Sequence, residues 1–135
     1  MFTFDTKIRV IYAEIDKMGY AYYGNYPKYY EEARSEAMRS LGLSYNEMEA
    51  QGVMMPVLDI NMRYIHPALY DDLLTVRSIV KEMPMAKMNF FYEIYNPAGT
   101  LIHTGNSLLG FMKADTHRAC RCPENFKNLL EPYFK

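Results

Sequence analysis

The sequence lacks the features that mark several classes of protein. Its 135 residues contain no tryptophan and only two cysteines, Cys120 and Cys122, so no disulfide framework is expected and the reducing cytoplasm is the simplest compartment. The net charge is −1, which argues against a nucleic-acid backbone as a partner. The longest stretch without Asp, Glu, Lys or Arg, Ile94 to Met112, contains proline, glycine and asparagine. It therefore predicts no integral membrane segment.

Tyrosine and methionine are abundant instead. Half of the residues are hydrophobic, and 13 are Tyr and 11 are Met. A chain of this length and composition predicts a single compact domain over residues 1–135. Met and Tyr suit a pocket for varied apolar groups, and ordinary core packing explains them equally well.

Alternation of apolar and polar residues predicts the strands. Residues 2–12 alternate as a half-buried strand does, and the same period of two recurs at 58–64, 73–83, 88–95 and 101–113. Residues 96–99 form a hairpin connection. The last strand is apolar on both faces near Leu108 and Leu109, as expected of a central strand or of one at a subunit interface.

Helical periodicity begins after Asn25. We expect a helix over residues 26–41 with Asn25 as N-cap, Pro27 in its first turn and Gly42 as its stop. Its apolar face would comprise Tyr26, Tyr29, Tyr30, Ala33, Ala37 and Leu41.

Two shorter helices complete the prediction. Residues 44–51 read as a helix capped by Ser44, with Glu47 completing a capping box. Pro123 opens a closing helix that runs through Leu130. Only the helix at 26–41 is long enough to cover the sheet, so the order of elements predicts an α+β fold in which an antiparallel sheet of about five strands wraps around one long central helix.

The segment between the first strand and this helix carries the most informative residues. Asp16 follows the strand, Gly19 and Gly24 permit unusual backbone geometry, and Tyr23 precedes the helix start. A carboxylate near the free N–H groups of a helix start can cleave an activated acyl group. Equally, a lone Asp can simply cap a turn.

These residues resemble a known family. Three blocks of the sequence resemble hotdog-fold thioesterases of the 4-hydroxybenzoyl-CoA thioesterase type. The first is the stretch from Asp16 to Tyr26 with Tyr30-Glu31-Glu32-Ala33-Arg34, and the second is His66-Pro67-Ala68-Leu69-Tyr70-Asp71-Asp72-Leu73-Leu74. The third and looser match is Arg118-Ala119-Cys120-Arg121-Cys122-Pro123. The three blocks occur in the family's order and span nearly the whole chain.

The resemblance implies roles for particular residues. Asp16 matches the catalytic carboxylate, which acts as nucleophile or general base, and Tyr23 matches the residue whose backbone N–H binds the thioester carbonyl. The family's Asn-Tyr pair at the helix start corresponds to Asn25 and Tyr26. Gly19 and Tyr22 belong to the same substrate-binding stretch.

Other site residues are weaker expectations. His66 can line the pocket rim, and Lys87 and Arg118 are candidates for the coenzyme A phosphates, although each can equally be a solvated charge. Glu31 and Glu32 are rival carboxylates, because a second branch of hotdog thioesterases uses a helix Glu.

No metal site or cofactor is expected, since coenzyme A is part of the substrate. The three histidines (His66, His103 and His117) are scattered over separate elements, and the two cysteines lack a second pair of ligands. The resemblance implies an acyl-CoA substrate and a dimer or tetramer with its active site built across two protomers. An acyl group on acyl carrier protein and a non-catalytic acyl-binding module are the alternatives.

Overall fold

One antiparallel sheet forms the body of the protein in the computed structural model, which describes all residues 1–135. Its strands lie in the order β1-β4-β5-β6-β3. Their bounds are β1 Phe2–Arg9, β3 Val57–Tyr64, β4 Leu73–Val80, β5 Lys87–Tyr95 and β6 Leu101–Gly110. Edge strands β1 and β3 therefore flank three interior strands, and the predicted α+β architecture is confirmed.

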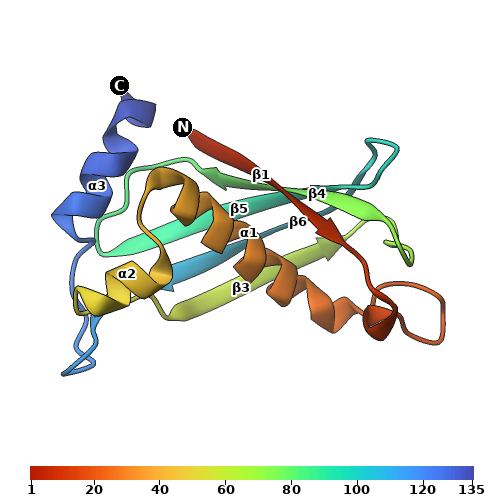
Figure 1. Cartoon of the computed structure of the whole chain (residues 1–135), viewed down its shortest axis with the longest axis horizontal. Helices are drawn as coiled ribbons and strands as arrows, with labels where there is room; N and C mark the ends of the chain where they lie inside the picture. The colour runs from red at the N-terminus through yellow and green to blue at the C-terminus, as the bar shows by residue number, and fades with distance from the viewer.

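Helix α1 (Tyr26–Leu41) lies across one face of the curved sheet (Figure 1). Five of the six residues predicted for its apolar face are buried, and Leu41 is half-buried. The Tyr30 hydroxyl packs directly against β6, since it occupies the space that a Cβ at Gly105 would need. Helix and sheet thus form one core.

Two strand ends differ from the prediction. The first strand stops at Arg9 rather than residue 12, because the Glu14 carboxylate accepts the N–H of Ile11 at 3.0 Å and starts a 3-10 turn, Tyr12–Glu14. The predicted 101–113 strand stops at Gly110. The next residues, β7 (Met112–Lys113), pair with β2 (Val53–Met54) in a separate small sheet. Strand β6 lies between β5 and β3, as its apolar composition indicated.

Helix ends follow the predicted chemistry with two exceptions, at Asn25 and at the predicted capping box, where the Glu47 side chain accepts the Ser44 hydroxyl at 3.2 Å rather than the Ser44 N–H. Gly42 ends α1 in the left-handed region, with φ +98°, and Ser44 caps α2 (Tyr45–Ala50) by accepting the N–H of Glu47 at 3.1 Å. Asn25 occupies the N-cap position of α1, as predicted, but its side chain makes no capping hydrogen bond. Its side chain instead donates to the carbonyl of Glu14 at 2.7 Å, so it ties the helix start to the preceding loop.

The C-terminal segment packs near the N-terminus at one end of the sheet (Figure 1). Pro123 precedes α3 (Glu124–Leu130), as predicted, and a 3-10 turn, Glu131–Phe134, follows. Phe126 and Leu130 bury α3 against the core. No helix of the protein combines the length and apolar character needed to span a membrane.

Candidate active site

The loop between β1 and α1 folds back on itself at Asp16. The N–H of Asp16 donates to Tyr20 O at 2.9 Å, and the N–H of Gly19 donates to Asp16 O at 3.0 Å. Gly19 has φ +83°, a conformation that side chains strain, which explains a glycine at this position. Gly24 is needed for a different reason, since a Cβ there would lie 2.6 Å from the Tyr22 ring.

The Asp16 carboxylate is half-buried and uses one of its oxygens within the loop. Oδ1 accepts the N–H of Met18 at 2.9 Å and the N–H of Tyr20 at 3.4 Å. None of the chain's hydrogen bonds uses Oδ2. Asp16 therefore caps the turn, as the simpler interpretation held, and still keeps one oxygen for chemistry.

Tyr23 begins the 3-10 turn Tyr23–Asn25 that leads into α1. The backbone hydrogen bonds of the loop use the N–H groups of Tyr22 and Asn25 but not that of Tyr23. An unpaired N–H at a helix start carries partial positive charge and suits an oxyanion. The hydroxyl of Tyr64, the last residue of β3, donates to Tyr23 O at 2.9 Å and anchors this turn to the sheet.

An aromatic cluster, buried at Tyr26 and His103 and half exposed at Tyr64, lies beside this turn. Tyr26 stacks on His103 of β6, with ring centroids 4.2 Å apart, and the edge of Tyr64 meets the same imidazole at 4.9 Å. His103 is completely buried, and Tyr30 hydrogen bonds to its Nε2. Burial lowers the pKa of His103 to about 4, so the imidazole is neutral at neutral pH.

The structure brings only some of the predicted site residues together. Gly19, Tyr22 and Tyr23 share the Asp16 loop, and exposed His66 lies at the same end of the sheet, where its N–H donates to Ile102 O. Tyr26 is buried, so within one chain its side chain faces the core rather than a ligand.

Lys87 and Arg118 lie at the opposite end. Lys87 pairs with Gly110, whereas Tyr64 pairs with His103, and the seven residue steps along β6 from His103 to Gly110 span roughly 23 Å at strand geometry. The N–H of Lys113 donates to Arg118 O, which places Arg118 beside β7. Both cations are exposed and outside the reach of Asp16 in the same chain.

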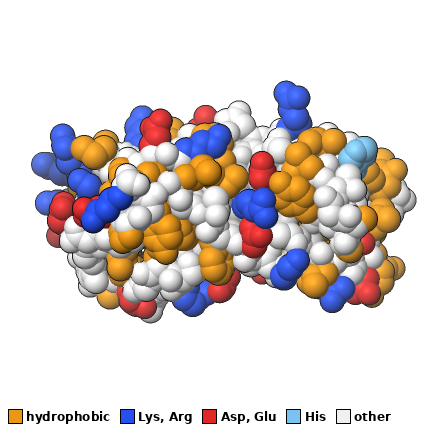
Figure 2. All heavy atoms as spheres, turned by 90° about the horizontal axis from the view of Figure 1, so that it is seen from above, with side chains coloured by type: hydrophobic (Ala, Val, Ile, Leu, Met, Phe, Trp, Pro, Cys, Tyr) orange, Lys and Arg blue, Asp and Glu red, His pale blue; other side chains and the backbone are white.

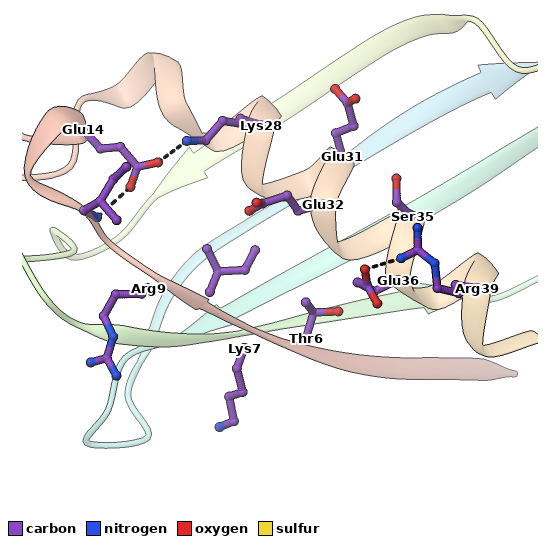
Figure 3. Close-up of a pocket in the computed structure, with 12 residues that line it drawn as sticks. Thr6, Lys7, Arg9, Glu14, Lys28, Glu31, Glu32, Ser35, Glu36 and Arg39 are labelled. Carbon is purple, nitrogen blue, oxygen red and sulfur yellow. Dashed lines mark hydrogen bonds and ion pairs between the residues drawn. The ribbon is translucent and has the colours of Figure 1, made fainter. Parts of the chain in front are cut away.

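Glu31 and Glu32 line a different hollow, a groove of about 660 Å³ between β1 and α1 (Figure 3). Both side chains are exposed. Arg34, a possible partner for them, instead turns inward and donates to the hydroxyl of Tyr45 at 2.9 Å. The groove contains neither Asp16 nor the Tyr23 turn.

Sequence reasoning missed three contributors to this region: Tyr64, His103 and Lys28. Tyr64 ends a predicted strand, but nothing in the alternation shows that its hydroxyl reaches Tyr23. His103 was noted only as one of three histidines on separate elements, and the sequence does not show that it packs beneath Tyr26 and Tyr64. No signal in the sequence distinguishes Lys28 from other surface lysines.

Comparison with known proteins decides the family. Residues 10–130 match the family model described as the Thioesterase-like superfamily. The chain belongs to this superfamily. The predicted hotdog fold and the predicted enzyme class, a thioester hydrolase, are thereby confirmed.

Individual relatives cover most of the chain. YneP of Bacillus subtilis is 36% identical over 121 residues, which are 90% of this chain and 81% of YneP. The acyl-CoA thioesterase YbgC of Helicobacter pylori is 30% identical over 133 residues, 92% of this chain and 97% of YbgC. A crystal structure of a DHNA-CoA thioesterase from Staphylococcus aureus superposes with a TM-score of 0.90 and 36% identity, over 99% of this chain and 90% of that one.

Proposed function

We propose that this thioesterase hydrolyses acyl-CoA thioesters to free acid and coenzyme A, with Asp16 as base or nucleophile and the Tyr23 N–H as oxyanion donor. The names of the relatives support the acyl-CoA substrate. The observation that supports the site is a carboxylate oxygen and a backbone N–H on one loop, neither of them used in the fold's own hydrogen bonds.

The chemistry has two balanced routes. In one, Asp16 attacks the thioester carbon, the C–S bond breaks, coenzyme A leaves as thiolate and takes a proton, and water then hydrolyses the anhydride. In the other, Asp16 removes a proton from a water molecule that attacks the same carbon, the C–S bond breaks, and coenzyme A leaves as thiolate and takes that proton. In both routes the carbonyl oxygen becomes negative, and the Tyr23 N–H stabilises it.

The first test replaces Asp16 by Asn. The amide oxygen of Asn can still accept the N–H groups of Met18 and Tyr20, so we expect normal folding. Without a charged oxygen, thiol release should fall by at least about 100-fold. The matched control is Asp72→Asn, because Asp72 also caps a turn, accepting the N–H of Leu69 at 3.0 Å. Full turnover in Asp16→Asn would sink the assignment.

The second test removes the proposed oxyanion donor. Proline at position 23 lacks an N–H, and Tyr22, with φ −58° and ψ 136°, already has the extended conformation that a following proline requires. Tyr23→Pro should reduce kcat by roughly 100- to 1,000-fold. Tyr23→Ala, which keeps the N–H, should retain most of the wild-type kcat. Equal losses in the two variants would show that the side chain matters and the amide does not.

A single-turnover reaction in H₂¹⁸O tests for the nucleophilic route. An ¹⁸O atom in the Asp16 carboxylate shows an anhydride hydrolysed at the Asp16 carbon, whereas the general-base route, like hydrolysis of the anhydride at the acyl carbon, labels only the released acid. Mass spectrometry of the peptide that contains Asp16 measures this. The same preparation, assayed with acyl-CoA and with acyl carrier protein thioesters, shows which carrier is preferred.

The proposal includes a second copy of the chain. Edge strand β3 has a free side, and Val57 and Leu58 at its start are about half exposed. Antiparallel pairing of two β3 strands would place the Val57 end of one copy beside the Tyr64 end of the other. Lys87 and Arg118 of the second copy would then approach the Asp16 loop, which the same chain's residues do not.

Exposed apolar side chains gather at the end of the molecule that carries the Asp16 loop (Figure 2, right). They belong to the segment before α1, to the end of β3 and to the loop after it, and comprise Ile11, Tyr12, Met18, Tyr20, Tyr22, Tyr23, Tyr64, Ile65, Leu69 and Tyr70. This surface supports burial of an acyl chain or of a second copy at the site.

Complementation tests the shared site. We would mix Asp16→Asn with a Lys87→Ala/Arg118→Ala double variant, each with little activity of its own. A site that combines Asp16 of one copy with Lys87 and Arg118 of the other regains activity in mixed dimers. A site built within one chain regains none. Sedimentation velocity on each sample establishes whether the copies associate.

A further inference from the structure

The Glu14 side chain is a buried charge just before the Asp16 loop. It is 6% exposed. Its Oε1 accepts the N–H of Ile11 at 3.0 Å and the hydroxyl of Tyr29 at 2.9 Å, and Lys28 donates to its Oε2 (Figure 3). The carboxylate thereby joins the end of β1 to the first turn of α1.

The backbone of the same residue holds the turn that contains Tyr23. Glu14 O accepts the N–H of Tyr22 at 2.8 Å and the side-chain amide of Asn25 at 2.7 Å. These two residues flank the Tyr23–Gly24 segment. One residue therefore contacts the strand end, the helix and both sides of the proposed oxyanion donor.

We propose that Glu14 is the positioning residue of the active site: its buried carboxylate, paired with Lys28, sets the place of Asp16 and of the Tyr23 N–H relative to α1. This inference rests on the proposed function. Glu14 does not touch the reacting atoms. It acts through the loop that carries them.

Only a carboxylate fits these contacts. Ile11 N–H, the Tyr29 hydroxyl and the Lys28 ammonium are all donors, and an ionised carboxyl group accepts from all three. A glutamine amide would turn an NH₂ group towards one of them. Burial raises the pKa of Glu14, but the hydrogen bonds from Lys28, Ile11 and Tyr29 outweigh it and lower the pKa below its usual range.

The test compares Glu14→Gln with Glu36→Gln. Glu36 lines the same groove and pairs with Arg39 on the same helix, but it is exposed and does not contact the Asp16 loop (Figure 3). We expect Glu14→Gln to lower kcat by roughly 10- to 100-fold with little change in KM, because misplacement of reacting groups costs rate rather than binding. Glu36→Gln should keep wild-type kcat.

Two further readouts separate positioning from loss of folded protein. Hydrogen–deuterium exchange should rise in Glu14→Gln for peptides covering residues 15–25 and stay unchanged in β5 and β6. In an Asp16→Asn background, Glu14→Gln should lower the residual rate by a smaller factor than in the wild type, because only the Tyr23 N–H remains to be positioned. If Glu14 had a purely structural role, Glu14→Gln would lower the rate by the same factor in the wild-type and Asp16→Asn backgrounds.

Each outcome decides the inference. Wild-type kcat in Glu14→Gln, or exchange that increases throughout the sheet, would overturn it. If wild-type protein releases no thiol from any acyl-CoA, the proposed function fails, and exchange in residues 15–25 alone decides whether Glu14 holds this loop. Unchanged exchange there would overturn the inference.

Discussion

Acidification should destabilise this protein through His103. The imidazole is completely buried on β6, its Nδ1 has no hydrogen-bond partner, and burial lowers its pKa from 6.5 to about 4. Below pH 6.5 the unfolded chain binds a proton that the folded protein does not. The free energy of unfolding therefore falls as the pH drops from 6.5 towards 4.

The size of this effect follows from the pKa values. Each pH unit in that window costs up to about 1.4 kcal/mol, so the change from pH 7 to pH 5 amounts to about 2 kcal/mol. Glu14 titrates in a different window. Its lowered pKa gives stability that is present above the usual value of 4.5 and is lost below it. Measurements at pH 5 and above therefore isolate the histidine.

Urea unfolding at pH 7, 6 and 5, followed by circular dichroism, measures the effect. His103→Gln keeps a polar atom for Tyr30 but does not titrate, so its stability should change by about 2 kcal/mol less than that of the wild type over this range. His66→Gln, which removes an exposed histidine at the same end of the sheet, is the control. Equal losses in wild type and His103→Gln would refute the reasoning.

Three further substitutions have defined outcomes. Gly105→Ala places a Cβ 2.0 Å from the Tyr30 hydroxyl and 2.5 Å from the backbone oxygen of Asn61, so urea unfolding should show a loss of about 3 kcal/mol; a loss near zero would mean that both neighbours shift at little cost. Tyr64→Phe removes the hydrogen bond to Tyr23 O, and kcat should fall about fivefold with unchanged melting temperature, whereas wild-type kcat would exclude Tyr64 from the site. Ser44→Ala removes the cap of α2 and should cost about 1 kcal/mol in thermal unfolding; no change would show that the cap is dispensable.

The elements of this fold follow largely from local patterns. The Tyr26–Leu41 helix and the strand alternations were predictable because burial of one face imposes a period on the sequence. Gly42 and Ser44 were predictable for a similar reason, since helix ends leave backbone groups that neighbouring residues must satisfy. Strand ends were less predictable, because β1 and β6 stop where contacts with distant residues begin.

The residues of the candidate site also divide into those that the sequence predicted and those that it did not. Asp16, Gly19 and Tyr23 lie within eight residues, so their spacing and their resemblance to hotdog thioesterases marked them from the sequence. Asn25 lies at the helix start as predicted, but the sequence does not show that the Glu14 carbonyl is within reach of its side chain, which therefore does not cap the helix.

What the sequence determined by itself is the class of fold, the family and the loop that carries the carboxylate, because each depends on residues close together along the chain. Only the tertiary structure decided that Glu14 is buried against Lys28 and Tyr29, that Tyr64 anchors Tyr23, and that Lys87 lies at the far end of the sheet from Asp16. These relations join residues distant in sequence, and they arise only when α1 packs on the sheet and fixes which side chains meet.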